Sequence, residues 1–227
     1  MTTKIEANLI AYTQPTINCR ISGPESLVAY CARVSSGKDH KDRGEDYEKL
    51  LRYCIKNKHW SVFEMVNAVV EVTAPRDITR QLLRHRSFSF QEFSQRYSSD
   101  IKFTERDYRH QDHKKRQNSL DTLTTEITNT CKSFEHNVRE VSKFAYQQFI
   151  EMEIAKECAR VILPEGLTLS TLYVNGTLRS WIHYLEVRDD PGVTQKEHVL
   201  LARKIKEVLE PVFPTIFRIK DENNNND

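Results

Sequence analysis

The chain has 227 residues, of which 38% are hydrophobic and 29% are charged, and its net charge is only +2. This size and composition predict one medium-sized domain with its own core and exclude a strongly basic or acidic protein. No apolar run approaches the ~20 residues of a membrane-spanning helix, and the first residues lack the apolar core of a signal peptide. We expect a cytoplasmic protein with one domain over residues 1–220 and a disordered Asn-rich tail over residues 221–227.

The first predicted element is a short strand over residues 5–13. A helix follows, with Ser22 as the expected N-terminal cap and Glu25 three positions later. A second helix is expected near residues 45–58, with its apolar residues on one side. A Val-rich strand is then predicted over residues 65–73.

The middle of the chain gives weaker patterns. Pro75 favours a helix start, with the helix continuing to about Arg84. Residues 87–97 begin with strict alternation and then lose it, so strand and extended loop both remain open. Residues 100–117 mix both signs of charge without an apolar period, which indicates an exposed loop.

The last part of the chain is predicted to be helical. Apolar residues recur at spacings of three and four over residues 119–162, which predicts a long helix buried against partners within the chain or in an oligomer. A further helix is expected over residues 178–188. Thr194 and Glu197 have the spacing of a capping box, which predicts a final helix through Leu209.

The cysteines and histidines give no metal pattern. Five cysteines are widely spaced without a Cys-x-x-Cys pair, which favours reduced thiols. His110 and His113 have no third candidate ligand nearby. We therefore expect no metal.

A dense basic segment is the most informative feature for function. Arg84-His85-Arg86 and Arg96 lie within thirteen residues of a nearly neutral chain. Such clusters are often solvated surfaces, but this one lies between predicted elements, where unpaired arginines are costly unless they bind an anion. Guanidinium groups match phosphate oxygens in pairs, whereas a polyanion such as DNA usually requires a broader basic surface. The segment therefore predicts a site for a small anionic ligand.

The same segment resembles a known family signature. Arg84-His85-Arg86, seven residues and then Ser94 match the motif of the flavin-dependent thymidylate synthases, and Arg96-Tyr97 extends the match. His59-x-Ser61-x-Phe63-Glu64 is similar to another segment of that family, although Met65 stands where His is common. Gln81 lies three residues before Arg84, so the two share a helical face.

Two later segments extend the resemblance, which spans about residues 25–200. Arg160 and the following Leu163-Pro164 fit the family's Arg-x-x-Leu-Pro element, although an arginine that compensates a helix dipole would also fit. Residues 177–188 contain Leu-Arg-Ser, then His183 four positions after Arg179 and Arg188 nine positions after it. An amphipathic helix with exposed arginines explains either arginine but not their joint spacing.

The resemblance implies a fold and a reaction. It implies an α+β single domain with a mixed β-sheet packed by long helices, assembled as a homotetramer with its sites at subunit interfaces. The implied reaction is the reductive methylation of dUMP to dTMP, with 5,10-methylenetetrahydrofolate as carbon donor, FAD as redox cofactor and NADPH as reductant. An arginine against the pyrimidine ring would stabilise the anion that activates it, and the resemblance gives this role to Arg188.

The resemblance also implies the ligand contacts. Those of FAD are Ser61, Arg84, His85, Arg86, Glu92, Thr177, Leu178, Arg179 and His183. Those of dUMP are Gln81, Leu82, Leu83, Arg84, Glu92, Phe93, Ser94, Gln95, Arg96, Arg160 and Arg188. Arg188 and Ser94 are the catalytic candidates. We expect Ser94 to bind the dUMP phosphate, because a serine nucleophile needs an adjacent base.

Two other readings remain open. A single-stranded nucleic-acid-binding module would use the arginines with Phe88, Phe90 and Phe93 as a stacking groove, but it would leave residues 177–188 and the His59 segment unused. A flavin reductase acting on another substrate would keep the flavin and change the chemistry. We expect no nucleic-acid and no membrane partner.

Overall fold

The computed structural model describes residues 3–16, 21–36 and 47–218. The predicted tail over residues 221–227 lies outside them. Within the described residues, no helix is both long and apolar enough to cross a membrane. No group of three or more His, Cys, Asp or Glu side chains in these ranges could hold a metal ion.

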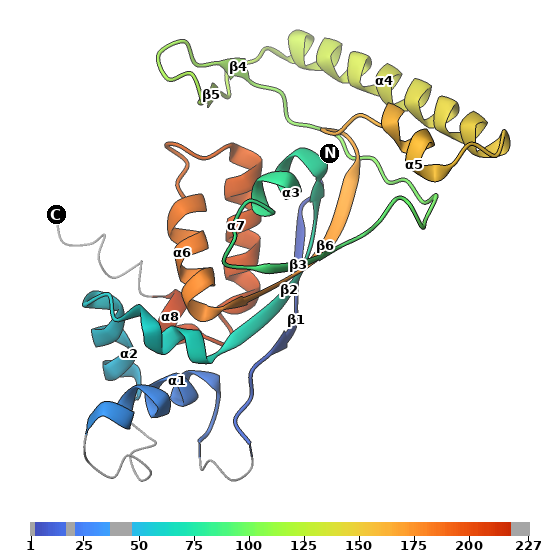
Figure 1. The fold of residues 1–227 in the computed structure, drawn as a ribbon. Helices are drawn as coiled ribbons and strands as arrows, with labels where there is room; N and C mark the ends of the chain where they lie inside the picture. Colours follow the sequence, from blue (N-terminus) through green and yellow to red (C-terminus); the bar gives the residue numbers. More distant parts are fainter. Residues whose placement is uncertain (1–2, 17–20, 37–46, 219–227) are drawn as a thin grey trace.

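A four-stranded sheet forms the centre of the molecule (Figure 1). Its strands are β1 (Glu6–Tyr12), β2 (Asn67–Pro75), β6 (Leu169–Thr177) and β3 (Ser89–Glu92), in that spatial order. Every neighbouring pair is antiparallel. The expectation of a mixed sheet is therefore wrong, because β6 lies between β2 and β3 and runs opposite to both.

Strand β6 is absent from the sequence-based elements, although it pairs with β2 along its whole length. Its residues Thr171, Leu172, Tyr173 and Val174 are β-branched, aromatic or apolar, a composition typical of strands. No element is predicted over residues 167–177, although this composition could have indicated a strand. The predicted strands near β1 and β2 are confirmed, and the ambiguous segment after Ser87 contains the short strand β3.

The described residues also form helices and short 3₁₀ segments. They are α1 (Pro24–Ala32), η1 (Arg33–Ser36), α2 (Tyr47–Lys56), η2 (Trp60–Met65), α3 (Arg76–Leu82), α4 (Thr125–Glu151), α5 (Lys156–Ala159), η3 (Arg160–Ile162), α6 (Leu178–Arg188), α7 (Lys196–Leu209) and α8 (Pro214–Phe217). A second, two-stranded sheet consists of β4 (His110–Gln111) and β5 (Ser119–Leu120).

Three helix boundaries differ from the predictions. The cap of α1 is Gly23 instead of Ser22, and its N–H donates to the Ser26 hydroxyl. The cap of α7 is Gln195, because the Thr194 hydroxyl instead donates to the carbonyl of Val187. The single helix predicted over residues 119–162 is wrong at both ends. Helix α4 begins at Thr125, with the Thr124 hydroxyl as its cap, and it stops at Glu151, because Glu153 has a positive φ of 59° that breaks the helical path.

The main core lies on one face of the sheet. Alternate residues of β2, from Ala68 to Ala74, are completely buried with residues of α6 and α7 such as Trp181 and Ile205. Glu71 and Thr73 on the other face of β2 are only partly buried. This alternation is that of an antiparallel sheet with one covered face.

Helix α4 lies apart from the main core and packs on α5 and η3 (Figure 1). Its buried residues, Glu135 and Tyr146, face the protein. The apolar stripe lies on a different side, where Phe134 is 66% exposed and Val141 is 68% exposed. The apolar stripe of α4 is therefore not covered by the described residues where it consists of Ile127, Phe134, Val138 and Val141.

Residues 100–117 are less exposed than their charge pattern predicts. The Arg106 and Arg109 side chains are only 12% and 10% exposed. Both pair with carboxylates from distant segments, Asp77 and Glu197 respectively. The exposed-loop prediction is therefore wrong for residues 103–109, where the charges of Arg106 and Arg109 are paired with carboxylates of distant segments, and is confirmed for residues 113–117, which are exposed.

Candidate active site

The Arg84-His85-Arg86 segment follows α3 in a tight turn. The His85 N–H donates to the Leu82 carbonyl, and the Phe88 N–H donates to the His85 carbonyl. The Phe88 ring then packs on Gly176, where an added Cβ would lie only 2.3 Å from ring atoms. Glycine at this point of β6 therefore lets the turn lie against the start of α6.

Arg188, at the end of α6, meets His85. Its Nε donates to His85 Nε2 at 2.9 Å, so this histidine nitrogen is an acceptor and the ring is neutral. Burial, together with the charges of Arg188 and His183, lowers the pKa of His85 to about 4. The Arg188 guanidinium therefore contacts a neutral imidazole instead of a carboxylate, and this contact does not neutralise its positive charge.

A second buried histidine connects Gln81 to the same region. His198 of α7 contacts Gln81 Oε1 through Nδ1 and the Tyr184 hydroxyl through Nε2, both at 3.2 Å. Burial, with the charges of Arg188 and His85, lowers the pKa of His198 to about 3. The fold therefore brings three predicted residues, Gln81, His85 and Arg188, together around His198. Sequence reasoning missed His198, because nothing near it in the sequence marks it.

A hollow of about 340 Å³ lies between η2 and α6, beside the turn at Ser87. It contains two predicted cofactor residues, Arg179 and His183, on one face of α6. Its lining residues are Trp60, Glu64, Ser87, Arg179, Ser180, Ile182, His183 and Glu186. Arg179 is held by Glu64, with Nη1 and Oε1 2.9 Å apart. Ser61 is the exposed neighbour of Trp60 in η2, next to this hollow.

Another hollow, of about 230 Å³, collects predicted substrate residues. It is lined by Arg76, Glu92, Phe93, Ser94, Gln95, Arg160, Leu169 and Ser170. Ser170 donates to the Glu92 carboxylate at 2.7 Å, and Arg76 donates to the Gln95 amide oxygen at 2.8 Å. Sequence reasoning missed Arg76, although a cation in the first turn of a helix is unfavourable with the helix dipole and could have marked it.

Other predicted residues have mainly structural contacts. The Thr177 hydroxyl caps α6 by accepting from the Ser180 N–H, and Arg96 pairs with Glu157. Leu82 and Leu178 are completely buried, and Leu83 packs against the same core. The three leucine side chains line neither hollow, so these residues would contact a ligand through their backbone atoms.

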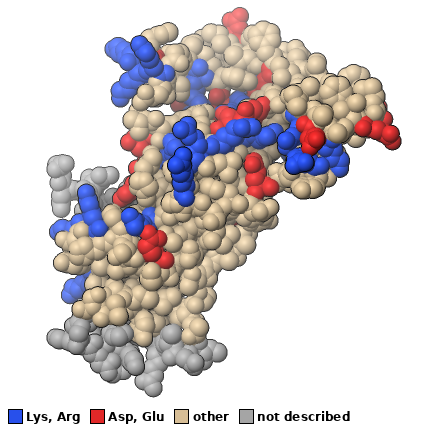
Figure 2. Space-filling model, viewed as in Figure 1, with Lys and Arg blue, Asp and Glu red and all other residues tan. Residues whose placement is uncertain are grey.

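Three arginines of the predicted site have no partner among the described residues: Arg84, Arg86 and Arg160. Arg84 and Arg86 are exposed, and Arg160 lines the second hollow. Elsewhere, Lys and Arg side chains are interspersed with Asp and Glu on the face shown in Figure 2. That face therefore shows no continuous basic surface of the kind that nucleic-acid binding usually requires.

Ser94 has no general base in hydrogen-bonding contact among the described residues. Its hydroxyl accepts from the backbone N–H of Arg96 at 3.3 Å. We expect Ser94→Ala to retain measurable dTMP formation and to raise the KM for dUMP by about 3- to 10-fold, the effect of one lost hydrogen bond. Steady-state kinetics check this. Complete loss of activity with unchanged dUMP affinity would instead establish a covalent role.

The two buried histidines predict acid sensitivity. In the unfolded chain each takes up a proton near pH 6.5, but in the folded chain only near pH 4 for His85 and pH 3 for His198. Between these values the unfolded state binds more protons, so stability falls as pH falls, by up to ~1.4 kcal/mol per pH unit for each histidine. Melting temperatures between pH 6.5 and 5 test this. The slope should be smaller in His198→Gln, and an unchanged slope would contradict the assignment.

Comparison with known proteins gives a consistent result. Residues 8–215 match the family described as thymidylate synthase complementing protein. A flavin-dependent thymidylate synthase of Synechocystis sp. is 44% identical over 93% of this chain and 97% of its own length. A probable flavin-dependent thymidylate synthase of Paramecium bursaria Chlorella virus 1 is 43% identical over 96% and 99%.

A solved structure is similar over almost the whole fold. The UMP/dUMP methylase PolB of Streptomyces cacaoi, bound with 5-Br dUMP, has a TM-score of 0.79 and 26% identity, over 95% of this chain and 94% of that one. The motifs at residues 59–64, 81–97, 160–164 and 177–188 all lie within the family match. The chain belongs to the flavin-dependent thymidylate synthase family.

Proposed function

We propose that this chain converts dUMP to dTMP by reductive methylation, with 5,10-methylenetetrahydrofolate as carbon donor and NADPH as reductant. The observation that carries the proposal is the contact between Arg188 and the neutral His85. A guanidinium that no carboxylate neutralises there can stabilise the negative charge that develops on a pyrimidine ring during attack through C5.

The hollow between η2 and α6 fits part of a flavin. Arg179 and His183 offer hydrogen-bond donors, and Trp60 offers an aromatic surface. Arg84 and Arg86 do not line this hollow, but they are exposed in the segment that leads to its Ser87 and could bind the phosphates of the flavin. FAD supplies the redox chemistry when bound. The chain's own residues would orient it, and Glu64 keeps Arg179 in place.

The second hollow fits the phosphate end of dUMP. Arg160 is unpaired there, and the Ser94 hydroxyl and the Gln95 amide lie beside it. Arg76 fixes the Gln95 amide through its oxygen, which leaves the amide N–H groups available to a phosphate. The wall of this hollow is thus set by contacts within the chain before any ligand binds.

The two halves of the site come together in a homotetramer under this proposal. No contact among the described residues joins the Ser94 hollow to Arg188, and the elements that form the two are different. The exposed apolar stripe of α4 provides a surface that requires a partner. Each complete site would therefore combine residues of more than one subunit. The expected compartment is the cytoplasm.

A complementation experiment tests the proposed function. Expression of the chain should allow a thymidine-requiring strain that lacks its own thymidylate synthase to grow without thymidine, whereas the Arg188→Ala variant should not. If the wild-type chain is produced in folded, flavin-loaded form and growth still requires thymidine, the proposed function is wrong.

A further inference from the structure

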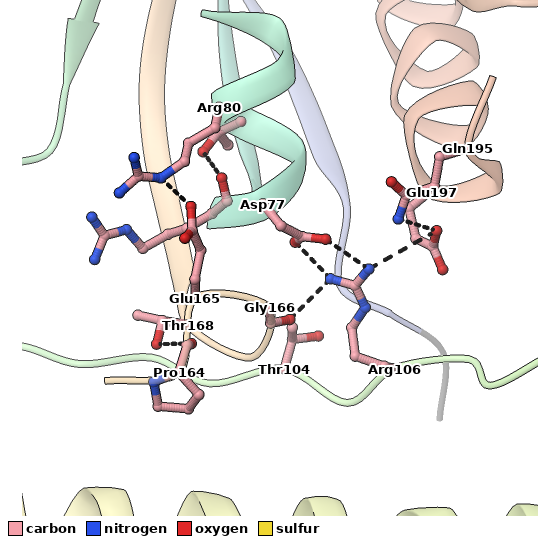
Figure 3. Close-up of polar contacts among 12 residues, drawn as sticks. Asp77, Arg80, Thr104, Arg106, Pro164, Glu165, Gly166, Thr168, Gln195 and Glu197 are labelled. Atoms are coloured by element: carbon pink, nitrogen blue, oxygen red, sulfur yellow. Dashed lines mark hydrogen bonds and ion pairs between the residues drawn. The ribbon is translucent and has the colours of Figure 1, made fainter. Parts of the chain in front are cut away.

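Four buried or half-buried charges link the 100–117 segment to α3 and α7. Arg106 donates to both carboxylate oxygens of Asp77, at 2.7 and 3.1 Å, and lies 3.9 Å from Glu197 (Figure 3). Arg109 donates to both oxygens of Glu197, at 2.8 and 2.9 Å. Burial alone would raise the pKa of Glu197, but the hydrogen bonds of Arg109 lower it below its usual value. Glu197 is therefore a buried carboxylate that stays ionised.

An ionised carboxylate can only accept hydrogen bonds, and this fixes the orientation of its neighbours. Gln195 Nε2 lies 3.0 Å from Glu197 Oε2, so the amide nitrogen of Gln195 faces the carboxylate (Figure 3). Its oxygen consequently faces Gln81 Nε2, at 2.8 Å. Gln81 must therefore donate to Gln195 and accept from His198.

The orientation of the Gln81 amide in turn determines which nitrogen of His198 carries the proton. Because Gln81 Oε1 can only accept, His198 Nδ1 carries the proton, and Nε2 accepts from the Tyr184 hydroxyl. The low pKa of His198 agrees with this neutral tautomer. One N–H of Gln81 is used by Gln195, and the second has no partner among the described residues.

We propose that Gln195 and Glu197 are positioning residues for dUMP binding, which act by presenting the second N–H of Gln81 to the nucleotide. This inference rests on the proposed function, in which Gln81 contacts dUMP. Without the fixed acceptor at Gln195, the Gln81 amide can rotate and offer its oxygen in place of the N–H. The ion pair of Arg109 and Glu197 thereby orients the Gln195 amide, and the Gln195 amide orients that of Gln81.

A double-mutant cycle on the flavin-loaded protein tests this inference. Calorimetry measures dUMP affinity for the wild type, Gln195→Met, Gln81→Met and the double variant. Each single variant should weaken dUMP binding by about 3- to 10-fold, and the double variant should bind as Gln81→Met does. Glu197→Gln should likewise weaken binding only when Gln81 is present, while lowering the melting temperature in both backgrounds. Lys196→Met, beside Gln195 on exposed surface, should bind dUMP like the wild type.

The outcomes separate this inference from the proposed function. Additive effects of Gln195→Met and Gln81→Met would show that Gln195 does not act through Gln81 and would overturn the inference. Wild-type affinity in Gln195→Met would overturn it as well. If Gln195→Met does not fold, the Glu197→Gln comparison in the two backgrounds decides. A flavin-loaded wild type that fails to bind dUMP would overturn the proposed function and this inference with it.

Discussion

Replacing Arg188 with alanine should reduce the rate of dTMP formation by about 100- to 1000-fold, the usual cost of removing a group that stabilises charge in the transition state. The protein should keep FAD and at least part of its NADPH oxidation, because Arg179 and His183 line a hollow that Arg188 does not. Rapid-quench or steady-state measurement of dTMP, together with flavin content from absorbance, checks both parts.

Arg203→Ala is the matched control for this variant. Arg203 is an exposed arginine that pairs with Asp189, the residue next to Arg188, so its loss perturbs the same helix end. It should leave dTMP formation near the wild-type rate. Loss of FAD in Arg188→Ala with unchanged dUMP affinity would mean that the roles of Arg179 and Arg188 are reversed, and full activity would remove Arg188 from the site.

A charge placed in the apolar stripe of α4 should have a comparably large effect. Phe134→Asp introduces a carboxylate, and burying an unpaired charge in an interface is costly. We therefore expect the proposed tetramer to dissociate and dTMP formation to be lost. The folded chain should survive, because Phe134 is exposed in the single subunit. Light scattering with circular dichroism measures assembly and folding separately.

The control lies on another side of the same helix. Asn129 is exposed and stands about 140° around α4 from Phe134 at 3.6 residues per turn. Asn129→Asp should leave assembly and activity unchanged. A Phe134→Asp protein that remains tetrameric would show that the stripe is not the interface. An active monomer would show that the site does not need a partner subunit.

The sequence alone was sufficient to predict which residues lie together when those residues are close in the chain. Arg179 and His183 lie four positions apart, and the structure puts both on one face of α6 and in one hollow. The residues from Glu92 to Gln95 likewise line one hollow. Helical spacing and short loops determine such arrangements, so residue types and intervals are sufficient to predict them.

Features that depend on distant residues could not be predicted in this way. His198 is identified only by its contacts with Gln81 and Tyr184, which are far from it in sequence. Arg106 and Arg109 lie in a mixed-charge segment whose buried partners belong to α3 and the start of α7. The antiparallel order of the sheet also follows from β6, whose pairing with β2 joins residues about a hundred positions apart.

The most direct test of the proposed reaction measures whether the methylene carbon of the folate is transferred to dUMP. The purified, FAD-loaded chain is incubated with dUMP, NADPH and 5,10-methylenetetrahydrofolate labelled in its methylene carbon. Our account predicts labelled dTMP whose formation requires all of these components and is lost in Arg188→Ala. NADPH oxidation without any labelled dTMP would contradict it, because the chain would then be a flavin reductase with another substrate.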